Sequence, residues 1–119
     1  MGKSVLVLVY AGCSTCKRAL HWLAARGVAV TVRPIVEEPP TKAELAAWIS
    51  KSGKPLRKWL NTSGQSYRAL GKAAVDAMGD AELVKSLSND GKLIKRPVLV
   101  AGDTVLVGFD EAAYDAAFE

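Results

Sequence analysis

Two cysteines near the start of the chain are the residues best suited to chemistry. Cys13 and Cys16 are the only cysteines in the sequence, and Ser14 and Thr15 separate them. An apolar run of Val and Leu ends just before the pair, and a helical pattern begins at it. A thiol at a helix start faces unpaired backbone N–H groups and the positive end of the helix dipole, which lower its pKa. Since the thiolate is the nucleophile, the pattern predicts thiol–disulfide chemistry.

The two thiols are expected to differ in role. Cys13 stands at the helix start, so it is the predicted attacking cysteine. Cys16 lies one turn further along and opens the apolar stripe of the helix, so it is the predicted resolving cysteine, which would release a mixed disulfide from Cys13. The neighbours Gly12, Ser14 and Thr15 are the predicted substrate contacts.

Two other interpretations of the cysteine pair stay open. A structural zinc site usually takes four ligands, whereas the chain offers two cysteines and one histidine. That histidine, His21, falls on the polar face of the predicted helix, so we expect no metal at the pair. The cysteines could also be unreactive residues at a helix end.

The hydrophobic pattern predicts the elements that hold the pair in place. A central strand covered on both faces is expected over Ser4–Tyr10, followed by a helix from about Cys13 to Arg26. Val28–Arg33 alternates and carries β-branched residues, which indicates a second strand, parallel to the first, in a β-α-β unit. The expected buried stripe of the helix is Cys16, Ala19, Leu20, Leu23 and Ala24.

Several short helices are expected after the second strand. The segments Thr41–Glu44 and Thr62–Gln65 both match a capping box, in which a hydroxyl and a Glu or Gln three residues later satisfy free N–H groups at a helix start. Pro55–Leu60 indicates another short helix, and Asp80 is expected to cap one more.

The last part of the chain predicts a hairpin and a closing helix. Val98–Ala101 and Thr104–Val107 are short apolar strands joined by Gly102-Asp103, and Asp110 is expected to cap the final helix. The order β-α-β, then β-β-α, predicts an α/β protein of thioredoxin-like fold with a helical insertion between the second and third strands. We expect one domain over residues 1–119, with the insertion over 37–89.

Composition argues against several classes of protein. The net charge is +4, and the chain lacks the dense basic stripe of a nucleic-acid-binding protein. The apolar runs are too short to span a bilayer, and no secretory signal is visible. We therefore expect a cytoplasmic protein that binds neither nucleic acid directly nor a membrane. In that reducing compartment a cysteine pair is seldom a structural disulfide.

The charges are unevenly distributed along the chain. Residues 1–36 carry only basic charges, Lys3 among them, and residues 97–119 carry only acidic ones, Glu119 among them. This asymmetry could steer an anionic ligand toward the first part of the molecule. It is also compatible with an ordinary surface that has no such role.

Four motifs, in this order, resemble the arsenate reductase/Spx family, a glutaredoxin-related group. They are Tyr10–Arg18, Asn61–Arg68, Ile94–Leu99 and Val107–Phe109. The resemblance covers nearly the whole chain and implies a thioredoxin-like fold with a helical insertion. It also implies that Cys13 is the redox-active thiol, and that Arg96 stabilises its thiolate or a bound anion.

The resemblance also places Pro97 in a cis peptide bond beside the active cysteine, where it would shape the wall against which a substrate docks. Arsenate reductases of this type hold the oxyanion with three arginines. Arg96 matches one of them, but Asn61 and Gly108 occupy the other two positions. Since an oxyanion needs several charge-assisted bonds, we expect weak oxyanion binding and little arsenate reduction.

Two functions are therefore expected ahead of arsenate reduction. The first is a thiol–disulfide oxidoreductase without a bound cofactor, which would use glutathione or thioredoxin as reductant or act on a protein disulfide. The second follows from the resemblance of the C-x-x-C to the Spx-like branch, and is a redox-sensing regulator that binds RNA polymerase.

Overall fold

The computed structural model describes residues 4–118, so Lys3 and Glu119 lie outside the described residues. The chain forms strands and helices in the expected order, with a run of short helices between the second and third strands. The elements are β1 (Val5–Val9), α1 (Ser14–Ala25), β2 (Val30–Pro34), α2 (Lys42–Ser52), the 3₁₀ helix η1 (Leu56–Trp59), α3 (Gln65–Leu70), α4 (Lys72–Asp76), α5 (Asp80–Asn89), the 3₁₀ helix η2 (Gly91–Leu93), β3 (Val98–Ala101), β4 (Thr104–Val107) and α6 (Glu111–Ala117).

The sheet has four strands in the order β2-β1-β3-β4. β1 pairs in parallel with β2 and antiparallel with β3, and β3 pairs antiparallel with β4. The central position of β1, the parallel β-α-β unit and the final hairpin are all confirmed. The architecture is the predicted thioredoxin-like α/β fold, in which Cys13 ends the loop after β1 and Cys16 lies in the first turn of α1.

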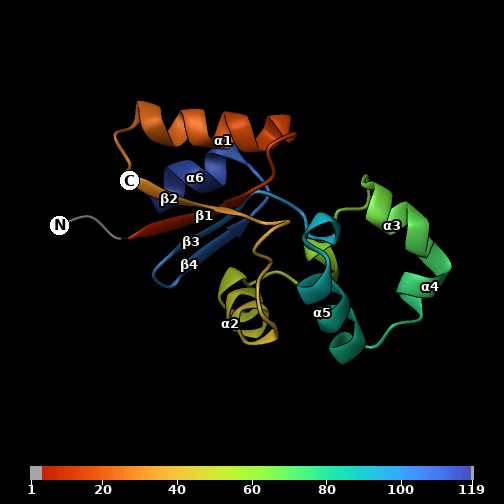
Figure 1. Cartoon of the computed structure of the whole chain (residues 1–119). Helices are drawn as coiled ribbons and strands as arrows, with labels where there is room; N and C mark the ends of the chain where they lie inside the picture. Colours follow the sequence, from red (N-terminus) through yellow and green to blue (C-terminus); the bar gives the residue numbers. More distant parts are fainter. Residues whose placement is uncertain (1–3, 119) are drawn as a thin grey trace.

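The two faces of the sheet bury separate hydrophobic clusters. Successive residues of a strand point to opposite faces, so Val5 and Val7 pack with α1 and α6, whereas Leu8 packs with the helices of the insertion. Figure 1 shows α1 and α6 above the sheet and α2 below it. The all-apolar sequence of β1 follows from this double coverage.

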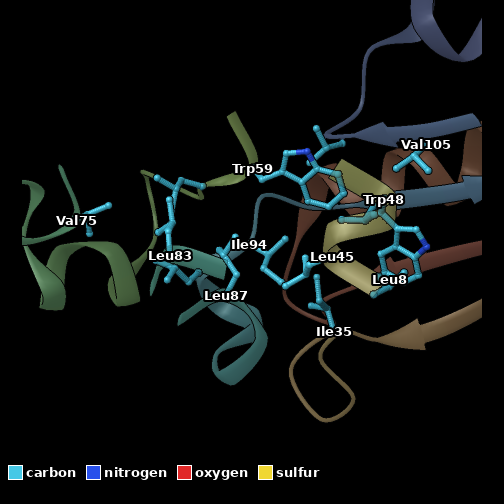
Figure 2. Close-up of a cluster of buried hydrophobic side chains, with 14 residues drawn as sticks. Leu8, Ile35, Leu45, Trp48, Trp59, Val75, Leu83, Leu87, Ile94 and Val105 are labelled. Carbon is cyan, nitrogen blue, oxygen red and sulfur yellow. The ribbon is translucent and has the colours of Figure 1, made fainter. Parts of the chain in front are cut away.

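The insertion between β2 and β3 packs on the sheet through a continuous apolar cluster. Figure 2 shows Trp59 and Ile94 in the middle of this cluster, with Leu8 toward the sheet and Leu83 toward the helices. An isolated bridge pairs Leu60 with Ile94, and joins the residue after η1 to the residue after η2. Figure 1 shows α3 and α4 extending away from the sheet as an outer arm.

Two expected helix caps in the insertion are wrong. The capping box of Thr41 forms as predicted, but the helix expected to start at Thr62 begins at Gln65, with Gly64 at its N-cap and no side-chain cap. A turn in which the Gly64 N–H donates to the Asn61 carbonyl precedes the helix, and Thr62 lies in this turn. Likewise Asp80 lies within α5, whose N-cap is Gly79, and α4 was not expected from the sequence.

The buried stripe of α1 also differs in part from the expectation. Cys16, Ala19 and Leu23 are buried as predicted, but Leu20 is only partly buried, Ala24 is exposed, and Trp22 is buried although it was not expected to be. Trp22 packs edge-on against Tyr114 of α6, with ring centroids 5.4 Å apart. The position of α6, which the helical periodicity of α1 does not reveal, therefore decides which side of α1 faces inward.

Within residues 4–118, none of the helices has the length and apolar character needed to cross a bilayer.

The basic and acidic parts of the sequence come close together in the folded chain. The acidic end of the chain folds against the basic helix α1, where Arg26 pairs with Asp115 at 2.7 Å. The charges that the sequence separates are thus partly brought together by the fold.

Candidate active site

Cys13 occupies the N-cap of α1. Its backbone has extended geometry, and its Sγ accepts the N–H of Cys16 at 3.2 Å. Its own N–H donates to the Tyr10 carbonyl at 3.0 Å, which closes the turn through Gly12. The thiol therefore takes the place that Ser, Thr or Asp usually takes at a helix start, and a thiolate is the better acceptor there because it carries charge.

The two thiols lie in different environments, as the sequence predicts. Cys13 is partly exposed, whereas Cys16 is 1% exposed and lies on the buried face of α1. Partial burial raises the pKa of Cys13, but hydrogen bonds from Cys16 and the charge of Arg96 outweigh it and leave this pKa below its usual value. Burial, reinforced by the neighbouring Cys13, raises the pKa of Cys16 to about 12. The pair thus combines an ionisable outer thiol with a protonated inner one.

Arg96 approaches the pair from the strand β3 side. Its guanidinium lies 4.7 Å from the Tyr10 ring centroid, and Nη1 donates to the Lys92 carbonyl at 3.3 Å. The Nε atom is buried and has no hydrogen-bond partner among residues 4–118. A buried donor without a partner is costly, so Arg96 keeps this position beside the pair at some cost in free energy.

The Arg96-Pro97 peptide bond is cis, as the resemblance implies. Pro97 is buried, and its carbonyl accepts the N–H of Gly108 at 2.9 Å. It is not among the residues that line the space in front of Cys13. Its neighbours Arg96 and Gly108 do line that space, so Pro97 joins two residues of the wall to each other.

An open hollow of about 520 Å³ lies in front of Cys13. We call it the Cys13 hollow, and its lining residues are Gly12, Cys13, Ser14, Thr15, Arg18, Asn61, Ser63, Lys95, Arg96, Gly108 and Phe109. The hollow brings together the expected substrate contacts Gly12, Ser14 and Thr15 with Cys13 and Arg96. Cys16 does not line it, in keeping with a thiol that reacts from behind the first one.

The hollow also contains residues to which the sequence assigned no role. Arg18 comes from α1, Ser63 from the insertion and Phe109 from the loop after β4, while Lys95 immediately precedes Arg96. All four lie within or directly beside the four quoted motifs. Adjacency to Arg96 was the available signal for Lys95, but the sequence did not show that its side chain lines the hollow.

Asn61 and Gly108, the two positions at which the resemblance implies arginines in arsenate reductases, both lie in the hollow. Asn61 is fixed there by its N–H to the Leu93 carbonyl at 2.9 Å and by its side-chain amide to the Lys92 carbonyl at 3.3 Å. Gly108 is buried and has φ +79°, a conformation that other residues rarely adopt. The departures therefore change the binding surface itself and not a remote part of the molecule.

Within the described residues, no group of three or more His, Cys, Asp and Glu side chains converges in the way a metal ion needs. His21 is exposed on α1, as predicted.

Fold and site together define a thioredoxin-like protein with two cysteines at a helix start, a cis-proline and a helical insertion. The chain belongs to the ArsC family, whose model matches residues 8–117. It is 42% identical over 107 residues to the uncharacterized protein YusI of Bacillus subtilis, a match that covers 89% of this chain and 91% of YusI. It is 28% identical over 101 residues to the regulatory protein MgsR of the same organism, covering 85% of this chain and 79% of MgsR.

A solved structure shows the same architecture. A putative ArsC family related protein from Bacteroides fragilis superposes with a TM-score of 0.91 at 39% identity, and the match covers 98% of each chain. Such similarity over almost the whole length confirms the expected family and fold, insertion included.

Proposed function

We propose that this protein is a thiol–disulfide oxidoreductase in which Cys13 attacks a disulfide and Cys16 resolves the product. One observation carries the proposal: the Sγ of Cys13 is held at the N-cap of α1 by the Cys16 N–H, beside Arg96, with the second thiol buried one turn below. The lowered pKa of Cys13 supplies thiolate near neutral pH, and the raised pKa of Cys16 keeps the second thiol protonated until it is needed.

The reaction would run in two exchanges. The Cys13 thiolate attacks one sulfur of a disulfide, forms a mixed disulfide with it, and expels the other half as a thiolate. Cys16 then loses its proton and attacks the Cys13 sulfur, which forms the Cys13–Cys16 disulfide and releases the second half of the substrate. Two electrons pass to the substrate, and an external thiol reductant returns them to the pair.

The reductant belongs to the class of glutathione or a thioredoxin-type dithiol, and the disulfide to the class of small-molecule or protein disulfides. Such reductants keep thiols reduced in the cytoplasm, the compartment in which we place the protein. In this proposal no prosthetic group takes part, because both electrons are held by the two sulfurs.

Turnover with purified protein tests the proposal. Hydroxyethyl disulfide is supplied as substrate, and its reduction is followed with glutathione or with thioredoxin as reductant. We expect Cys13→Ser to abolish turnover, and Cys16→Ser to accumulate a mixed disulfide on Cys13 that mass spectrometry detects. Equal turnover by the wild type and Cys13→Ser would overturn the assignment.

A redox-sensing regulator is the second candidate, and the similarity to a protein named as regulatory, MgsR, favours it. Here oxidation of the pair would alter an interface with RNA polymerase. Capture of polymerase subunits from cell extract, under oxidising and reducing conditions, distinguishes this function from catalysis. Absence of polymerase in both conditions argues against the regulator.

Arsenate reduction is the least supported activity. The hollow offers Arg96 but has Asn61 and Gly108 where arsenate reductases of this type carry arginine. We expect arsenate-dependent oxidation of glutathione to equal a blank without protein. A rate clearly above that blank would show that the remaining cations suffice.

A further inference from the structure

The Cys13 hollow has an unbalanced set of charges. Arg18, Lys95 and Arg96 line it, and no carboxylate does. Within residues 4–118, none of these three cations has an acidic oxygen within 4.0 Å, since the ion pairs found there involve other residues. Three cations around one small space repel one another, so an anion entering the hollow would relieve an existing electrostatic cost.

Two arginines outside the hollow are paired with carboxylates. Arg26 pairs with Asp115, and Arg33 pairs with Glu44 at 2.9 Å. Arg18 lies in the first half of α1 and Arg26 is its C-cap, so the balance of charge changes along α1. The end of α1 away from the cysteines is neutralised by the acidic helix α6, whereas the end at the cysteines keeps its positive charge.

The side chain of Lys95 packs against Gly108. A Cβ added to Gly108 would stand 3.0 Å from Cε and 3.8 Å from Nζ of Lys95. The lysine side chain therefore lies directly over the backbone of Gly108, across the space that a side chain at position 108 would enter. The absence of a side chain at 108 thus lets the ammonium group reach the wall of the hollow.

Arg18 faces the same space from α1. Its guanidinium lies 5.7 Å from the centroid of the Phe109 ring, which is within the range of a cation–π contact. Asp110 and Glu111 line a second hollow together with Arg18, but within residues 4–118 no carboxylate oxygen lies within 4.0 Å of the Arg18 guanidinium nitrogens. Arg96, by contrast, already stacks on Tyr10 and interacts with Cys13. Lys95 and Arg18 are thus the cations left for a ligand.

We propose that Lys95 and Arg18 make this site selective for disulfides that carry an anionic group, such as a carboxylate, close to the reacting sulfur. The inference rests on the proposed function and adds its substrate class. A carboxylate bound to Lys95 would bring a disulfide sulfur up to Cys13. The lysine charge would offset the repulsion between that carboxylate and the Cys13 thiolate. The half expelled by Cys13 would leave as a thiolate that also bears the carboxylate.

The first test measures charge at Cys13 without requiring turnover. In a Cys16→Ser background, which leaves one thiol, the rates of alkylation by anionic iodoacetate and neutral iodoacetamide are compared as a ratio. We expect Lys95→Gln to lower this ratio by roughly three- to tenfold, the size expected for one solvent-exposed charge contact. Lys58→Gln is the matched control: it removes an exposed lysine of η1 that does not line the hollow, and should leave the ratio unchanged.

The second test compares turnover of three small disulfides of similar size. We expect anionic dithiodipropionate to react faster than neutral hydroxyethyl disulfide and cationic cystamine to react slowest, and the preference for the anion to fall in Lys95→Glu and at high salt. An alkylation ratio that Lys95→Gln does not change, or an equal preference in wild type and Lys95→Glu, would overturn the selectivity. If the wild type turned over none of the three, the proposed function would fail, while the alkylation ratio would still decide the role of Lys95.

Discussion

The β1–α1 region and the insertion between β2 and β3 contain similar local signals, but use them differently. In the first, the hydrogen bond to the Cys13 sulfur and the one from the Cys13 N–H both join it to residues three positions away, Cys16 and Tyr10. In the insertion, the Thr41 capping box forms whereas the similar sequence at Thr62 does not. The difference lies in tertiary contact, because Asn61 beside Thr62 is tied to the η2 segment by two hydrogen bonds.

The comparison shows how the two regions divide the site between them. In the β1–α1 region local hydrogen bonds hold the Cys13 sulfur, so we expect its position to depend little on the insertion. The opposite wall of the hollow depends on long-range packing, since Asn61 and Ser63 belong to the insertion and Lys95 and Arg96 follow it directly. Changes in the insertion should therefore affect stability and substrate choice more than the intrinsic reactivity of Cys13.

The largest effect on the insertion should come from Gly91→Ala. A Cβ at Gly91 would overlap the carbonyl oxygen of Ile35, where the end of the insertion touches the segment after β2. We expect a loss of about 3 kcal/mol in the free energy of unfolding, the upper range for overpacking. At Gly79 an added Cβ meets nothing within 4 Å, so Gly79→Ala should cost less than about 1 kcal/mol. Urea unfolding measures both, and equal losses would contradict the close approach.

The next effect concerns the ion pair that ties β2 to α2. Arg33 donates to both carboxylate oxygens of Glu44 at 2.9 Å, and the Thr41 N–H donates to one of them. We expect Arg33→Met to lower the free energy of unfolding at about pH 7 by roughly 2 kcal/mol, as for hydrogen bonds to a charged group.

This second loss should depend on pH. The hydrogen bonds from Arg33 outweigh partial burial and hold the pKa of Glu44 below its usual value near 4.5. The pair therefore stabilises the fold fully above that usual value, and its contribution disappears as the pH falls through the lower value of the folded state. The difference between wild type and Arg33→Met should shrink at about pH 2. A difference that is the same at both pH values would show that the arginine acts by packing alone.

A smaller effect is expected for Arg96→Met on the β1–α1 region. Removal of the guanidinium takes away a cation that favours the Cys13 thiolate, so the pKa of Cys13 should rise. Alkylation by iodoacetamide near neutral pH should slow by roughly tenfold, and the rate should recover at alkaline pH. Arg68→Met is the control, because Arg68 donates to the Ser63 carbonyl at 2.6 Å and does not line the Cys13 hollow. An unchanged pH profile in Arg96→Met would mean that the helix start alone, without Arg96, lowers the pKa of Cys13.

The smallest effect separates the two capping sequences directly. The Thr41 hydroxyl accepts the Glu44 N–H at 3.1 Å, so Thr41→Ala should cost about 1 kcal/mol. Thr62 is exposed and outside its helix, so Thr62→Ala should stay within about 0.5 kcal/mol of the wild type. Thermal unfolding of both variants gives the comparison. A larger loss at Thr62 would mean that this threonine caps the helix in solution.

Much of the fold follows from the sequence because its signals act between near neighbours. The cap at Asp110, the strands Val98–Ala101 and Thr104–Val107, and the helix beginning after Cys13 depend on side chains only a few residues apart. The predicted buried face of α1 is wrong in part because a distant element takes part. Trp22 turns inward because α6 lies beside α1, and no pattern within α1 contains that information.

By itself, the sequence determined the candidate pair: two thiols one turn apart at a helix start, to which the family resemblance added an arginine and a proline. Only the tertiary structure decided which charges surround that pair. It folds the acidic C-terminal helix onto the far end of α1, where Arg26 finds Asp115, and leaves Lys95 over Gly108 at the near end. A helix cap is set by hydrogen bonds between residues close along the chain, whereas the charge around a sulfur is a sum over groups that only folding brings together.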